Sequence, residues 1–198
     1  YRLMFTGIIQ DLGTIEKLDN GLFNIKTKLD LSNCKDGSSI SCNGVCLTAK
    51  NISMKNLTYS FEVNIGEETL KRTNLSQIIE NNSIINIEKS LTIGDEVGGH
   101  FVYGHIDTVT SLINIVNQNN SWEYYFRKDF GKDNKFIAEK ASISINGISL
   151  TIANVYDDSF NVSIIEHTYK NTNLQFLKLN DNVNIEFDYL ARFVTSND

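Results

Sequence analysis

Proline is absent from this chain of 198 residues, although about 5% is usual in proteins. Turns must therefore be made by asparagine, glycine and aspartate, which tolerate the left-handed backbone region or bond their own backbone. No apolar run approaches the ~18 residues of a membrane span, so we expect no membrane partner. The start carries no apolar signal segment, which favours a cytoplasmic protein. Tyr1-Arg2-Leu3 precede a plausible initiator Met4 and are left out of fold reasoning.

Positive charge is also scarce. The chain has 18 Lys+Arg against 24 Asp+Glu, a formal net charge of −6, and no basic stripe, which argues against a nucleic-acid partner. Its three cysteines, Cys34, Cys42 and Cys46, are an odd number in one half of the chain. They fit reduced thiols better than a disulfide framework.

What the chain does contain is a tandem repeat. The stretch SISCNGVCLT, Ser39 to Thr48, returns as SISINGISLT, Ser142 to Thr151. Three further pairs keep the same order: SFEVNIGEETLKRTNL with SFNVSIIEHTYKNTNL, NIE at 86–88 with NIE at 184–186, and FTGIIQDLG with FVYGHIDTV. Because four collinear pairs do not arise by chance, the repeat indicates two homologous domains.

Each half reads as short strands rich in Ile, Val, Phe and Thr, separated by Asn, Asp and Gly clusters. Halves of this size remove their exposed edges most simply by closing into barrels. We therefore predict an all-β fold of two tandem, homologous six-stranded Greek-key barrels, at residues 4–97 and 98–188, with a short C-terminal helix at 189–198. Helical turns are expected at ETLKRTNL, HTYKNTNL and about 132–140, and extra residues between Thr48 and Ser60 predict a longer hairpin loop in the first half.

The repeated decapeptide predicts a β-hairpin, because Asn-Gly suits a type I′ turn. With Asn43-Gly44 as the turn, one face is apolar and the other carries only small polar side chains: Ser39, Ser41, Cys46 and Thr48. The second copy repeats the split, with Ser142, Ser144, Ser149 and Thr151. Such a face could meet solvent, or it could leave room for a flat ligand, and both interpretations stay open at this point.

The stretch GGHFVYGHID, residues 98–107, adds two histidines in a strand-like segment. On a strand, His100 and His105 would point to opposite faces, and the only other histidine is His167, so no zinc site is expected. No Gly-x-Ser-x-Gly elbow occurs, which speaks against a Ser-His-Asp hydrolase.

Together, MFTGIIQ at Met4, NGVCLT at Asn43, GGHFVYGHID at Gly98 and NGISLT at Asn146 resemble riboflavin synthase, the single-chain family with two homologous β-barrels. The resemblance spans Met4 to about Val194. It implies a dismutation in which one 6,7-dimethyl-8-ribityllumazine gives a four-carbon unit to another, yielding riboflavin and 5-amino-6-ribitylaminouracil without metal or organic cofactor. It also implies a homotrimer whose site lies between the first barrel of one subunit and the second of its neighbour, and it leaves an association with lumazine synthase open.

The resemblance further implies two pockets. The first would hold Gly7, Ile8, Ile9, Cys46, Leu47, Thr48, Asn64, Ile65, Gly66, Glu67, Glu68 and Thr69. The second would hold Gly104, His105, Ile106, Lys140, Ser149, Leu150, Thr151, Ile165, Glu166, His167, Thr168, Tyr169 and Lys170. The side chains of suitable type for catalysis are Cys46, His105, Ser149 and Thr151. Glu67 and Glu166 stand where many relatives have proline, so both loops lose a fixed φ.

Two other hypotheses remain: a non-catalytic lumazine- or flavin-binding protein on the same fold, and a tandem barrel module that binds a macromolecular partner. The tail adds a structural question. Phe187, Leu190, Ala191 and Val194 would form one apolar stripe on a short helix, and so short a helix needs a partner surface. That surface is either its own barrel or the same helix of neighbouring subunits.

Overall fold

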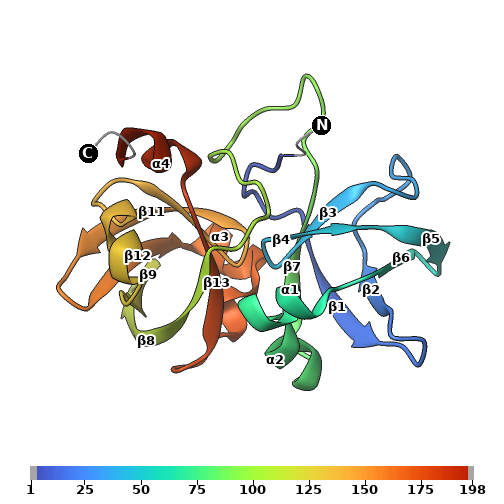
Figure 1. The fold of residues 1–198 in the computed structure, drawn as a ribbon, viewed down its shortest axis with the longest axis horizontal. Coiled ribbons are helices and arrows are strands. Elements are labelled where there is room, and N and C mark those ends of the chain that lie inside the picture. The colour runs from blue at the N-terminus through green and yellow to red at the C-terminus, as the bar shows by residue number, and fades with distance from the viewer. Residues whose placement is uncertain (1–3, 196–198) are drawn as a thin grey trace.

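The computed structural model describes residues 4–195, so Tyr1-Arg2-Leu3 and the last three residues lie outside the described part. Figure 1 shows two β units lying side by side, with short helices around them. The predicted all-β fold of two tandem units with a short C-terminal helix is confirmed. No helix between residues 4 and 195 is long and apolar enough to cross a membrane.

The first unit is built from seven strands in the order β4-β3-β7-β1-β2-β6-β5. Two helices, α1 (Glu67–Arg72) and α2 (Leu75–Glu80), lie between β6 and β7. The strands are β1 (Asp11–Lys17), β2 (Phe23–Thr27), β3 (Ser39–Cys42), β4 (Val45–Thr48), β5 (Lys50–Lys55), β6 (Thr58–Val63) and β7 (Ile84–Lys89). Only Ala49 separates β4 from β5, the two ends of this sheet. The seventh strand therefore arises because one strand is interrupted. The ladder does not close around this unit, so the expected closed six-stranded barrel is found only in the second unit, and the first is a half-barrel.

The second unit is a closed barrel of six strands in the order β10-β11-β12-β9-β8-β13, as expected. Its strands are β8 (Thr108–Gln118), β9 (Ser121–Arg127), β10 (Ser142–Ile145), β11 (Ile148–Val155), β12 (Ser159–Ile165) and β13 (Asn182–Phe187). Strand β11 runs unbroken where the first unit has β4 and β5. The helical segments are the 3-10 helices η1 (Gly131–Phe136) and η2 (Asn173–Phe176), and the α-helices α3 (Glu166–Asn171) and α4 (Tyr189–Thr195).

Three local expectations need correction. The extra residues before Ser60 do not form a longer loop, because only Asn56-Leu57, both with positive φ, join β5 to β6. The added residues lengthen the hairpin strands instead. Residues 98–107 are not a strand either, since their one bridge joins Val102 to Phe5. Finally, Phe187 closes β13 in the core of the second barrel and is not part of the tail helix.

Each unit has its own apolar core, and the hairpins contribute one face to it as predicted. Ile40, Cys42, Val45 and Leu47 are buried in the first core, and Ile143, Ile145, Ile148 and Leu150 in the second. The alternation of strands thus sends the opposite side chains, including Cys46 and Ser149, to the outer face of each sheet.

Six buried asparagines connect the two units, in three pairs that the repeat relates: Asn43 with Asn146, Asn74 with Asn173, and Asn86 with Asn184. The bonds cross from one unit to the other. Asn184 Nδ2 donates to the carbonyl of Asn43 (2.9 Å), and Asn86 Nδ2 donates to the carbonyl of Asn146 (3.0 Å). Asn74 N–H donates to Asn184 Oδ1, and Asn173 N–H to Asn86 Oδ1, both at 2.7 Å. We call this set the asparagine network.

Asn86→Ala tests how much the asparagine network stabilises the fold. The substitution removes the bonds from Nδ2 to Asn146 and Asn173 and leaves the Asn173 N–H without its acceptor. We expect urea unfolding to show a loss of roughly 2–5 kcal/mol, because each buried group left unpaired costs about 1–3 kcal/mol. Asn117→Ala, at an exposed position of β8, is the matched control. A loss below about 1 kcal/mol would contradict the assignment.

Candidate functional site

The two repeated hairpins have the predicted register. Ser41 pairs with Cys46 and Ser39 with Thr48 in the first, and Ser144 pairs with Ser149 and Ser142 with Thr151 in the second. The turn residues have positive φ, as a type I′ turn requires: 54° at Asn43 and 83° at Gly44, 49° at Asn146 and 81° at Gly147. The two turns touch, since a Cβ on Gly44 would lie 2.7 Å from the nitrogen of Gly147.

The small polar face of each hairpin is only partly open. In the first hairpin Ser39 and Ser41 are buried, Cys46 is partly buried and Thr48 is exposed. In the second, Ser144 is buried, Ser142 and Ser149 are partly buried and Thr151 is exposed. Backbone of the other half covers the inner end of each face. Small side chains are thus required there by the contact between the halves, and only the outer end of each face, with Thr48 or Thr151, is exposed.

One glycine from each half lies against the hairpin of the other half. The carbonyl of Gly104 accepts from the Cys46 N–H (2.9 Å), and the carbonyl of Gly7 accepts from the Ser149 N–H (2.8 Å). Both glycines have positive φ, and a Cβ on Gly104 or Gly7 would lie 2.5 or 2.6 Å from the Cβ of Cys46 or Ser149. Only glycine fits such a contact.

Because each glycine contacts the hairpin of the other half, the predicted site residues are grouped differently from the expectation. The resemblance placed Gly7 to Ile9 with Cys46 and Gly104 to Ile106 with Ser149, whereas the structure puts Gly7 beside Ser149 and Gly104 beside Cys46. The neighbours follow the same exchange. Ile9 packs against the core of the second unit, and Ile106 against the core of the first.

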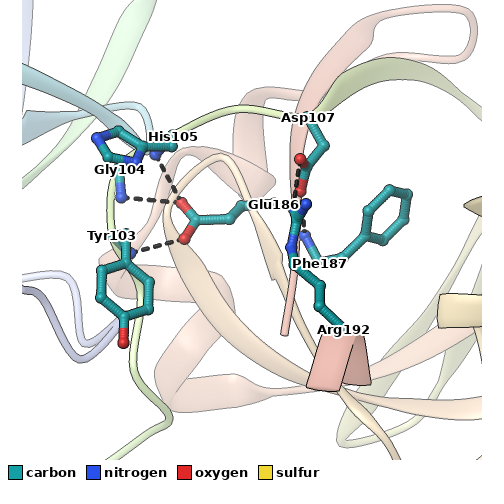
Figure 2. A network of polar contacts seen from close by, with 7 residues as sticks. All are labelled: Tyr103, Gly104, His105, Asp107, Glu186, Phe187 and Arg192. Carbon is teal, nitrogen blue, oxygen red and sulfur yellow. Dashed lines mark hydrogen bonds and ion pairs between the residues drawn. The ribbon is translucent and has the colours of Figure 1, made fainter. Parts of the chain in front are cut away.

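Each glycine segment is held by a buried glutamate from its own half. Figure 2 shows the carboxylate of Glu186 facing the backbone of Tyr103, Gly104 and His105, whose N–H groups donate to it at 2.6, 2.9 and 3.0 Å. The carboxylate of Glu88 accepts from the N–H groups of Thr6 (2.8 Å) and Gly7 (3.1 Å). Burial raises the pKa of both carboxyls to about 7, and the backbone donors oppose that rise.

Cys46 and Ser149 have different surroundings despite their equivalent positions. Burial is the first cause that raises the pKa of the Cys46 thiol, and the charge of Glu186 adds to it, so the thiol is protonated at neutral pH. Ser149 Oγ lies 2.7 Å from His100 Nδ1. Burial lowers the pKa of His100, and the charge of Asp188 opposes this effect. Because the pKa is lowered, the ring is neutral and can accept a proton.

The other predicted site residues lie at or near the surface. The His105 side chain is exposed, and its backbone N–H is bound to Glu186. Lys140 is exposed, and its N–H donates to the carbonyl of Ile152, next to Thr151 (2.8 Å). Residues 64–69 run from the end of β6 into α1, and residues 165–170 run from the last residue of β12 into α3; both stretches are mostly exposed. Ile8 is exposed, and Leu47 and Leu150 belong to the cores.

Sequence reasoning missed three residues of this arrangement: His100, Glu88 and Glu186. His100 was placed on a strand face away from His105, and only the irregular path of residues 98–107 brings it to Ser149. The two glutamates occupy the same place in the repeated NIE triplets, and this repetition could have identified them as candidate residues. No three His, Cys, Asp or Glu side chains of residues 4–195 gather in a way that could hold a metal ion.

The tail helix α4 packs on its own barrel. Arg192 forms an ion pair with Asp107, whose other carboxylate oxygen accepts from the Phe187 N–H (2.9 Å) (Figure 2). The ring of Tyr189 lies 5.0 Å from that of Tyr103. Leu190 and Phe193 are 64% and 60% exposed, so the helix still presents apolar surface outward. The side chain of Val194 lies outside the described residues.

The comparison with known proteins also divides the chain into two halves. The family described as lumazine binding domain matches residues 6–90 and again residues 103–188. Riboflavin synthase of Actinobacillus pleuropneumoniae is 38% identical over 195 residues, which cover 96% of this chain and 88% of that protein. Riboflavin synthase of Bacillus subtilis is 33% identical over 195 residues, with the same two coverages. A crystal structure of LumP complexed with riboflavin has a TM-score of 0.76 at 23% identity, covering 92% of this chain and 98% of that chain, which shows a shared fold.

The two glutamates predict an unusual dependence of stability on pH. Their pKa rises from 4.5 to about 7 in the folded protein, so the folded state binds more protons than the unfolded state between these values. Their contribution is complete below pH 4.5 and is lost as the pH rises through 7, on the order of 3 kcal/mol for each carboxyl. We therefore expect the free energy of unfolding, measured in urea, to fall between pH 5 and pH 8. The double variant Glu88→Gln/Glu186→Gln should flatten this slope, and an unchanged slope would refute the assignment.

Proposed function

This chain belongs to the riboflavin synthase family of tandem lumazine-binding domains, and we propose that it converts two 6,7-dimethyl-8-ribityllumazine molecules into riboflavin and 5-amino-6-ribitylaminouracil. The observation that carries this proposal is a duplicated site with one difference. Both hairpins have the same register and receive a glycine carbonyl in the same way, but one presents Cys46 and the other Ser149.

A reaction between two copies of one molecule needs two pockets of nearly equal shape that perform different tasks. The repeated backbone supplies the equal shape, and the Cys46/Ser149 difference supplies the different tasks. Holding both rings in register also replaces a bimolecular encounter, and well-oriented reactants can save roughly 7–11 kcal/mol of the barrier. Catalysis in this proposal is therefore mainly positioning, aided by proton transfer.

The Ser149–His100 pair is the best candidate for that proton transfer. A serine hydroxyl, or a water in its place, is a weak nucleophile until a neighbouring base removes its proton. His100 lies at hydrogen-bond distance and is neutral, so it can accept this proton. Cys46 stays a neutral thiol, which suits contact with an uncharged ring better than attack on it.

Each domain is proposed to hold one lumazine, with boundaries at residues 4–97 and 98–188. The ligand would lie at the outer end of the polar face, beside Thr48 or Thr151, and against the junctions 64–69 or 165–170. In the second pocket the backbone of Lys140 is bonded to Ile152, which follows Thr151 in the chain, and the exposed Lys140 side chain would offer a positive charge. His105 and Thr151 remain candidates for placing a water or removing a methyl proton.

A second copy of the chain would complete each site. Thr48 and Thr151 are exposed, so a ring beside either of them has one face open to water. The exposed apolar side chains of Leu190 and Phe193 on α4 offer a surface for association. We therefore propose a cytoplasmic homotrimer in which the first domain of one subunit faces the second domain of its neighbour.

The direct test is to incubate the protein with 6,7-dimethyl-8-ribityllumazine and follow riboflavin by its absorbance. We expect turnover, with two lumazines consumed for each riboflavin formed. Binding without turnover would instead support a non-catalytic lumazine-binding protein, and the absence of both would support a module with a macromolecular partner.

His100→Gln and Ser149→Ala should each slow turnover by roughly 10²-fold, in the range expected for loss of a positioned base. Substrate affinity, measured by fluorescence titration, should change little. Because His100 acts as a neutral base, kcat should fall as the pH drops through its pKa, which lies below 6.5. His105→Gln is the comparison variant: an equal loss there with normal rates in His100→Gln would transfer the role of base to His105.

Deletion of residues 189–198 tests the oligomer. The deletion must begin at Tyr189, because Phe187 belongs to the barrel core. We expect a smaller particle in sedimentation and lower activity, with activity regained at high protein concentration. Arg192→Ala, which keeps the helix but removes the ion pair to Asp107 and the contacts of the guanidinium with the rings of Phe136 and Tyr189, is the milder control. A fully active monomer after the deletion would exclude a shared site.

A further inference from the structure

Glu88 and Glu186 are buried carboxyls, 3% and 5% exposed, and neither has a role in the chemistry proposed above. Each is bound by backbone N–H groups of a single short segment. Glu186 receives three N–H donors from residues 103–105, and Glu88 receives the Thr6 hydroxyl besides two N–H donors from residues 6–7. A carboxylate with this many donors fixes the path of the segment that supplies them.

The segment fixed by each glutamate contacts the hairpin of the other half. Gly104 donates its N–H to Glu186 and accepts the Cys46 N–H with its carbonyl. Gly7 donates its N–H to Glu88 and accepts the Ser149 N–H in the same way. One glycine therefore joins a buried carboxylate of its own domain to the residue at the proposed reactive position of the other domain.

We propose that Glu88 and Glu186 are positioning residues that act across the domain boundary: Glu186 sets the place of Cys46, and Glu88 sets the place of Ser149. This inference rests on the proposed function, since it assigns the two hairpins to the substrate sites. The hydrogen bonds that hold Cys46 and Ser149 in place can be tested without substrate.

The backbone beside the hairpin residues is closely packed. A Cβ on Gly99 would lie 2.7 Å from the Cβ of Ser149, so the backbone of both Gly7 and Gly99 lies close to Ser149. A segment released from its glutamate would move its carbonyl away from the hairpin N–H. Misplacement of a reacting group by about 1 Å can cost 10²-fold in rate.

The competing possibility is an effect within one domain. Glu88 lies opposite Ser41, which lies opposite Cys46, in one row across β7, β3 and β4. Glu186, Ser144 and Ser149 form the equivalent row across β13, β10 and β11. If these rows transmitted the effect, Glu88 would control Cys46 and Glu186 would control Ser149. The two alternatives predict opposite pairings.

The experiment is amide hydrogen exchange of the full chain, resolved at the Cys46 and Ser149 N–H groups, in Glu88→Gln and Glu186→Gln. We expect Glu186→Gln to speed exchange at Cys46 by at least tenfold and to leave Ser149 within twofold of the unsubstituted protein. Glu88→Gln should do the reverse. Glu80→Gln, an exposed glutamate at the end of α2, should change neither.

Equal acceleration at both amides, or acceleration only within the same domain, would overturn the proposal. If a glutamine variant does not fold, Glu186→Asp and Glu88→Asp, which withdraw the carboxylate by one methylene, give the same crossed comparison. In the riboflavin assay each glutamine variant should lower kcat by roughly tenfold or more and leave KM within about threefold. A crossed exchange pattern in a protein that makes no riboflavin would refute the proposed function and leave the positioning intact.

Discussion

The contact between the two hairpin turns is the constraint on which the rest of the structure depends. Bringing backbone of two domains this close buries polar groups that lose their hydration, and each one left unpaired costs about 1–3 kcal/mol. The asparagine network pairs most of these groups, because a carboxamide side chain can donate and accept at once, although the Nδ2 of Asn146 has no partner among the described residues. Asn43 and Asn146 shape the turns, and the other four asparagines bind backbone across the boundary. The two domains are thereby fixed as one body.

From this contact follow the features of the candidate sites. The hairpins carry small side chains at their inner ends because the opposite domain covers them, and glycine is required at positions 7 and 104 because a Cβ would collide. The buried glutamates then satisfy the backbone of these glycine segments. Positions that suggest a binding face in the sequence are thus partly structural, and only the outer end, with Thr48 and Thr151, is exposed.

The equivalence of the two sites makes their difference meaningful. LumP, solved in complex with riboflavin, has the same fold, and a shared fold does not by itself say which chemistry a site performs. At equivalent positions of the two hairpins, Ser149 Oγ lies 2.7 Å from Nδ1 of the neutral His100, while burial raises the pKa of Cys46 and keeps it a protonated thiol. Duplication therefore supplies two hairpins of equal geometry, and single substitutions give their equivalent positions unlike surroundings. The difference between the two sites lies in single side chains, which a comparison of folds does not detect.

The sequence by itself determined the tandem repeat, the β class, the hairpin register and the faces of Cys46 and Ser149, because these depend on local turn chemistry and on the alternation of strands. Only the tertiary structure decided that Gly7 lies beside Ser149 and Gly104 beside Cys46, that His100 reaches Ser149, and that Phe187 ends a strand. Residues 4–10 and 98–107 have almost no regular structure, so no periodicity reveals their path. Their places are set by packing between domains, and the distance between two folded units is not a property of any local stretch of sequence.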